Sequence, residues 1–123
     1  MLERIGQIAI RVRDLDRAVA FYRDVLGLKL LFRAPPALAF FDVGGVWLML
    51  SPPDRAEFDH PASILYFDVA DILAAHETLS ARGVSFREEP HRIHAEAGRE
   101  LWLASFLDSE GNTYALRSWR PTH

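Results

Sequence analysis

The stretch QIAIRVRDLDRAVAFYRDVLGL, residues 7–28, carries the clearest structural pattern in the chain. Over residues 7–13 an apolar side chain recurs at every second position, which predicts a strand with one face in a core. Asp14 is typical of a helix N-cap, and apolar residues then follow at helical spacing up to Gly27, a residue that commonly ends helices. This stretch therefore predicts a strand followed directly by a helix.

Three further strands are predicted after this helix. The turns between them are indicated by Pro35-Pro36 and by Gly44-Gly45, because proline and glycine break or reverse strands. The first half of the chain is therefore expected to have the order βαβββ. The predicted strands cover residues 28–33, 37–42 and 46–51.

The second half of the chain repeats this order. Val12 and Asp14 have identical counterparts 57 positions later, and Asp42 and Gly45 have identical counterparts 66 positions later. Constant offsets of this kind indicate an internal duplication. The predicted elements are a strand at 64–69, a helix between Asp71 and Gly83, and strands near 84–87, 101–107 and 113–118, with a linker at 52–62 and a polar loop at 88–99.

Composition limits the classes of protein that the chain can belong to. A length of 123 residues fits one domain with a conventional core, and the absence of cysteine excludes disulfides, thiolate metal sites and thiol nucleophiles. A net charge of −3 argues against non-specific nucleic-acid binding. There is no signal-peptide pattern and no apolar run long enough to span a membrane, so we expect a cytoplasmic protein.

Four segments carry more specific motifs: VRDLDRAVAFYRDVLGL (residues 12–28), FDVAD (67–71), Gly83-Val84 and FLDSEGN (106–112). With these motifs the chain resembles the vicinal oxygen chelate superfamily, which includes glyoxalase, bleomycin resistance proteins and extradiol dioxygenases. The resemblance implies an α+β fold in which two βαβββ modules form a curved mixed sheet around a cup, with helices on the outer face. It also implies a metal or small ligand in the cup, and dimers. The expected single domain covers 1–123, with modules at about 5–51 and 63–119 joined by the linker 52–62.

The same resemblance locates the positions of metal ligands in metal-dependent members. Divalent metals that support oxygen chemistry require His, Asp or Glu at such positions. Two of the four residues here have no donor atom, one is a soft thioether, and a single amide oxygen cannot hold a metal. We therefore expect no metal and no other cofactor. The four positions are Gln7, Met49, Ile64 and Ala115.

The residues expected to line the cup describe a small-molecule site. Trp47 and Tyr66 are suited to stack on a planar ring, and Arg11 or Arg117 to hold a carboxylate or phosphate. The favoured function is thus metal-independent binding of an apolar or aromatic compound with an anionic group. Two alternatives stay open, namely that the arginines only pair with Asp68 or other acids, and that the aromatic residues belong to a core or dimer interface. The ligand-binding residues are predicted as Gln7, Arg11, Trp47, Met49, Ile64, Tyr66, Ala115 and Arg117.

A second hypothesis is that the chain is an enzyme whose active site uses residues other than those at the family's usual metal positions. His91, His94 and Glu100 lie within a dozen residues, so they are candidates for acid–base catalysis or for a divalent metal at a non-standard site. The reaction would then be of the lyase, isomerase or dioxygenase type. A purely structural dimerisation module is a third reading. The expected partners are a small molecule and a second copy of the chain in a homodimer, with no nucleic acid and no membrane.

Overall fold

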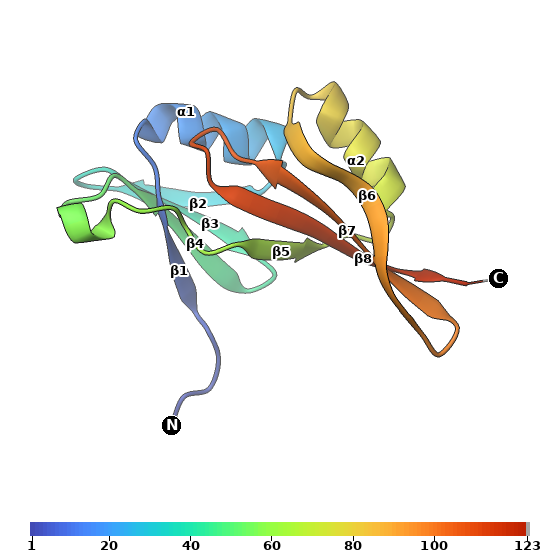
Figure 1. Ribbon diagram of the computed structural model, residues 1–123. Helices are drawn as coiled ribbons and strands as arrows, with labels where there is room; N and C mark the ends of the chain where they lie inside the picture. Colours follow the sequence, from blue (N-terminus) through green and yellow to red (C-terminus); the bar gives the residue numbers. More distant parts are fainter. Residues whose placement is uncertain (123) are drawn as a thin grey trace. The chain divides into compact units, whose positions relative to one another are not determined.

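The computed structural model describes residues 1–122. These residues form two compact units, and the boundary between the units in the sequence lies between Ala62 and Ser63. Each unit contains one four-stranded mixed sheet and one α-helix (Figure 1). Both units have the order βαβββ, which confirms the predicted α+β class. No helix in the described part of the chain is long and apolar enough to cross a membrane.

The first unit has the strand order β1-β4-β3-β2. Strand β1 runs parallel to β4, and the other neighbours are antiparallel. The residues after β4, predicted as a linker, contain a single 3₁₀ turn at Ala56–Phe58. The elements are β1 (Gln7–Arg11), α1 (Leu15–Ala20) with a π-helical turn at Phe21–Val25, β2 (Lys29–Ala34), β3 (Leu38–Val43) and β4 (Val46–Ser51).

Helix α1 begins where its sequence predicts, but it ends at Ala20, and a π-helical turn at Phe21–Val25 continues it toward Gly27. The carboxylate of Asp14 accepts a hydrogen bond from the backbone N–H of Arg17 at 3.0 Å, as an N-cap does. The chain leaves the helical turn through Gly27 at φ 73°, a left-handed conformation that favours glycine. Tyr22 belongs to the π-helical turn, and its buried ring packs against that of Phe41 on β3, with centroids 5.7 Å apart. Each such buried side chain contributes roughly 2 kcal/mol by leaving water.

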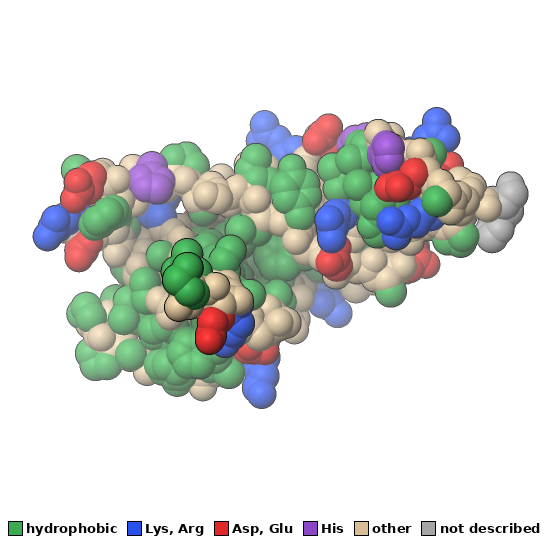
Figure 2. Space-filling model, turned by 90° about the horizontal axis from the view of Figure 1, so that it is seen from below, with side chains coloured by type: hydrophobic (Ala, Val, Ile, Leu, Met, Phe, Trp, Pro, Cys, Tyr) green, Lys and Arg blue, Asp and Glu red, His purple; other side chains and the backbone are tan. Residues whose placement is uncertain are grey.

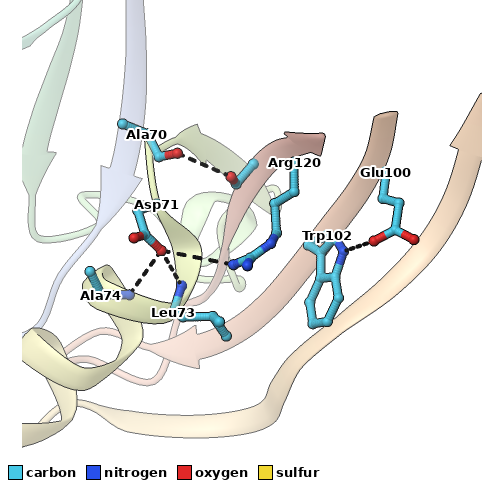
Figure 3. Close-up of polar contacts among 8 residues, drawn as sticks. Ala70, Asp71, Leu73, Ala74, Glu100, Trp102 and Arg120 are labelled. Atoms are coloured by element: carbon cyan, nitrogen blue, oxygen red, sulfur yellow. Dashed lines mark hydrogen bonds and ion pairs between the residues drawn. The ribbon is translucent and has the colours of Figure 1, made fainter. Parts of the chain in front are cut away.

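The second unit has the equivalent strand order, β5-β8-β7-β6, with β5 parallel to β8. Helix α2 is capped by Asp71, which accepts hydrogen bonds from the backbone N–H groups of Leu73 and Ala74 at 3.1 and 3.2 Å (Figure 3). The same order in both units is what the duplication predicts. The elements are β5 (Leu65–Asp68), α2 (Ile72–Ala81), β6 (Ser85–Glu96), β7 (Arg99–Leu107) and β8 (Thr113–Pro121).

The prediction of a polar loop at 88–99 is wrong. Most of that segment belongs to β6, which forms a long hairpin with β7 and turns at Ala97 and Gly98, both with positive φ. Two features made this strand difficult to predict from the sequence. Its pairing register shifts three times, which destroys the alternation of polar and apolar residues. Pro90 also argued against a strand, but β6 is the edge of its sheet, where proline is tolerated.

Candidate functional site

The sheet of the first unit has one face packed against α1 and one face without a helix, which we call the helix-free face. Its residues follow from the register, because paired strand positions share a face. Ile10, Leu48 and Leu50 point to the other side and are buried in the core. The helix-free face therefore presents Gln7, Ala9 and Arg11 from β1, Trp47, Met49 and Ser51 from β4, and Leu38, Phe40 and Asp42 from β3.

An aromatic cluster lies on this face. Phe32 and Phe40, on neighbouring strands, stack with ring centroids 4.6 Å apart. The indole of Trp47 meets both rings edge-on, at 5.7 and 5.8 Å. Phe32 and Trp47 remain 44% and 37% exposed, so the cluster offers aromatic surface to a ligand. Seen from the side away from the helices, hydrophobic side chains gather in patches at this part of the molecule (Figure 2).

A pocket of about 700 Å³ lies entirely within the first unit and is lined in part by Met49, the register partner of Phe40. Arg11 and Met49 of the helix-free face line it together with the turn after β2 and with residues that follow β4. The segment predicted as a linker, 52–62, thus forms one wall of the pocket. The lining residues from that segment are Pro52, Pro53, Asp54, Phe58, His60 and Ala62.

Arg11 is the only Arg or Lys among the described residues that line this pocket. Its side chain is just 12% exposed, and its Nη1 lies 3.2 Å from Oδ1 of Asp59 in the wall segment. Asp59 is 44% exposed, and Nη2 of Arg13 approaches the same oxygen at 3.9 Å. A guanidinium held in an apolar pocket is a strong carboxylate-binding group, since it offers several N–H donors in a fixed plane.

The predicted residues of the second unit lie on the side of its sheet away from α2. Tyr66 and Ala115 are register partners on β5 and β8, and Ala115 is buried whereas Tyr66 and Ile64 are about half exposed. Nε of Arg117 donates to Oδ1 of Asp68 at 2.7 Å. This hydrogen bond lowers the pKa of the Asp68 carboxyl and raises that of Arg117.

The three residues of the enzyme hypothesis do not converge. His91 and His94 pair in register with Leu103 and Leu101, whereas Glu100 directly precedes Leu101 on β7 and so faces the opposite side of the sheet. Glu100 accepts a hydrogen bond from Nε1 of Trp102 at 3.0 Å (Figure 3), and this contact lowers the pKa of the Glu100 carboxyl. His91 and His94 each lie near a different glutamate, Glu88 at 4.0 Å and Glu96 at 3.5 Å.

The donors at the four family metal positions do not fit a divalent metal. Nε2 of Gln7 donates to Sδ of Met49 at 3.6 Å, so this amide and thioether are directed at each other. Ile64 and Ala115 have hydrocarbon side chains with nothing to coordinate. Throughout residues 1–122 there is no group of three or more His, Asp or Glu side chains placed to hold a metal ion. A metal bound by this chain would need a different donor set.

Sequence reasoning missed several residues of this site. Phe32 and Phe40 were not predicted as site residues, because the pairing of β2 with β3 shifts its register and alternation therefore does not indicate which face of the sheet they lie on. Phe58, His60 and Asp59 were not predicted because a proline-rich segment without apolar periodicity is read as a connector. The one available signal was Phe58 itself, an isolated aromatic residue among polar neighbours.

Two repeated βαβββ units, each with one four-stranded mixed sheet, define a class of proteins built on duplicated modules. The sequence profile of the Glyoxalase/Bleomycin resistance protein/Dioxygenase superfamily matches residues 4–116. The chain belongs to this superfamily, as its motifs predicted.

The chain is also similar to individual known proteins. It is 30% identical over 74 residues to the metallothiol transferase FosB of Staphylococcus haemolyticus, a match that covers 58% of this chain and 52% of FosB. The chain thus spans about half the length of such curated relatives. Two crystal structures share the fold over 96% or more of this chain and 98% of theirs. One is a superfamily member from Sphaerobacter thermophilus (TM-score 0.81, 23% identity), and the other is TnmS3, an antibiotic binding protein from Streptomyces sp. CB03234 (TM-score 0.78, 22% identity).

Proposed function

We propose that this protein binds a small, mostly aromatic molecule with an anionic group, and does so without a metal. The observation that carries this proposal is the pocket of the first unit, which is lined by Arg11 and Met49 of the helix-free face, the same face that carries the aromatic cluster Phe32, Phe40 and Trp47. Its volume of about 700 Å³ is within the usual range for small-molecule sites, roughly 300–1,000 Å³. The fold serves the same kind of task in TnmS3, an antibiotic binding protein.

The aromatic rings, the arginine and the apolar wall of this site would make different contributions to binding. The exposed faces of Phe32 and Trp47 would stack on a planar ring, and removing that ring from water would provide most of the affinity. Arg11 would fix the orientation of the ligand by charge-assisted hydrogen bonds to its anionic group. The apolar wall made by Pro52, Pro53 and Phe58 would exclude water from this contact.

The relatives named as metallothiol transferases make metal dependence the main competing interpretation. Metal independence is supported by the side chains at the four family positions, which lack the His, Asp and Glu donors that divalent metals require in such sites. The competing interpretation has a clear consequence, because an enzyme of that kind would lose its function on chelation.

The test combines metal analysis with ligand binding. Protein purified without chelator is examined by elemental analysis, and a panel of naphthalene- and quinoline-type compounds, charged and neutral, is titrated by calorimetry before and after treatment with EDTA. We expect less than stoichiometric metal, and binding of anionic members that EDTA leaves unchanged. Stoichiometric metal with binding lost after EDTA would overturn metal independence. Failure of every compound to bind would overturn the binding function.

We further propose that the protein works as a homodimer. The second unit leaves apolar side chains exposed on the sheet face away from α2, among them Ile64 and Tyr66, which the proposed ligand site does not use. A second copy of the chain would cover such surfaces symmetrically, as most homo-oligomers do. Light scattering coupled to gel filtration measures the mass directly, and a monomer at micromolar concentration would contradict this proposal.

A further inference from the structure

The wall segment 52–62 is attached to the sheet at a charged point. Pro52 and Pro53 lead out of β4, and a 3₁₀ turn follows, in which the backbone N–H of Phe58 donates to the carbonyl of Arg55 at 3.0 Å. Phe58 itself is 51% exposed and lines the pocket, so it does not anchor the segment in a core. Asp59, next in sequence, makes the ion pair with Arg11, which lines the pocket.

The two partners of this ion pair lie in different environments. The guanidinium of Arg11 is almost buried and belongs to the rigid strand β1, whereas the carboxylate of Asp59 is nearly half exposed and belongs to an irregular segment. Ion pairs with an exposed partner contribute little to stability, because water and salt compete for both charges. Asp59 is therefore the partner that a competing carboxylate can replace at small cost.

We propose that Asp59 occupies the position of the ligand's anionic group, and that an aromatic carboxylate binds by displacing Asp59 from Arg11. This inference rests on the function proposed above and narrows its ligand class to carboxylates. A ligand carboxylate offers Arg11 the same oxygen geometry that Asp59 offers, and its ring adds contact with apolar lining residues of the pocket such as Met49 and Phe58. Release of Asp59 frees the wall segment 52–62, so binding and opening of the pocket are coupled.

A carboxylate and its neutral isostere provide the primary test on the unaltered protein. We expect 2-naphthoate to bind wild type about tenfold or more tightly than 2-naphthamide in calorimetry, since only the carboxylate forms charge-assisted hydrogen bonds with Arg11. The NMR signal of the Asp59 carboxyl carbon should shift when 2-naphthoate is added and stay in place with 2-naphthamide. Equal affinities would overturn the inference and leave the broader binding function intact.

The variant Asp59→Asn gives a result that a simple structural ion pair would not produce. Removal of the competing carboxylate should tighten 2-naphthoate binding about two- to fivefold and leave 2-naphthamide unchanged. Asp16→Asn is the matched control, because it removes one carboxylate from the same unit, where Asp16 pairs with Arg33 at 2.7 Å outside this pocket. It should leave both affinities unchanged.

Arg11→Gln should remove the preference for the carboxylate, with circular dichroism to verify the fold. Weaker binding of 2-naphthoate by Asp59→Asn, or an equal gain in Asp16→Asn, would overturn the displacement. Absence of binding by both probes, in wild type and in Asp59→Asn, would overturn the inference as well, while the compound panel above decides the broader function separately.

Discussion

Arg117 and Asp68 are register partners on the parallel strands β8 and β5, and Nε of the arginine lies 2.7 Å from Oδ1 of the aspartate. This pairing corresponds to the alternative that the sequence left open, in which the arginines of the cup serve neighbouring acids. Arg11 is paired in the same way with Asp59, at the longer distance of 3.2 Å. Only Arg11 also lines the pocket of its unit, which is why the proposed function depends on it.

The Asp68–Arg117 contact predicts a pH dependence of stability. The folded state lowers the pKa of Asp68 below its usual range, chiefly through the hydrogen bond from Arg117. The contact therefore stabilises the fold above the unfolded-state pKa, and this contribution is lost as the pH falls through the lowered pKa. Urea unfolding at pH 7 and near pH 2.5 should show a smaller loss in Asp68→Asn than in wild type. Glu3→Gln, in the exposed amino-terminal segment, should show the full loss, and an equal reduction in both variants would contradict the prediction.

Trp47 should report ligand binding by its fluorescence. The chain has three tryptophans, of which Trp47 lies in the aromatic cluster whereas Trp102 and Trp119 contact Arg120 and Arg99 in the second unit. An anionic ligand of the panel without absorbance in the tryptophan range should quench the fluorescence of wild type, Trp102→Phe and Trp119→Phe, but not that of Trp47→Phe. The affinity of Trp47→Ala should fall by about 0.5–1.5 kcal/mol, the usual value of an aromatic pair. Quenching that persists in Trp47→Phe would place the ligand elsewhere.

The duplication provides a matched pair of turns for a stability test. In the second unit, Oδ1 of Asp108 accepts hydrogen bonds from the backbone N–H groups of Glu110 and Asn112, both at 2.8 Å, and Asp108 is 6% exposed. Asp108→Ala should lower the free energy of unfolding by about 2–3 kcal/mol, because it leaves buried donors without acceptors.

Asp42, its counterpart in the first unit, is half-buried beside a turn that Gly44 and Gly45 form through positive φ angles. Asp42→Ala should therefore cost less than about 1 kcal/mol in the same urea measurement. Equal losses in the two variants would show that the two turns are stabilised in the same way.

Replacement of both His91 and His94 by alanine tests whether these histidines take part in ligand binding. Both side chains are exposed or half-exposed on the β6–β7 hairpin, and Glu100 faces the other side of the sheet. The double variant should bind the compound panel with wild-type affinity and unfold at a similar urea concentration. A loss of binding without a loss of stability would contradict this prediction and show that these histidines take part in binding.

Local sequence determined the elements of the first unit and most of those of the second. Caps such as Asp14 and Asp71 act on backbone groups two or three residues away, and the alternation in β1 reports one buried face, so neighbouring residues suffice to predict both. The hairpin of β6 and β7 was missed because its strand character depends on pairing with distant residues and on an edge position that tolerates Pro90.

By itself the sequence determined the family and the duplicated plan, because both are properties of residue identity and spacing. The tertiary structure alone decided which residues form the pocket. It brought the wall segment 52–62 against β1, paired Arg11 with Asp59 48 positions away, and stacked Phe32 on Phe40. Such contacts depend on how strands and turns pack in space, and no periodicity along the chain encodes them.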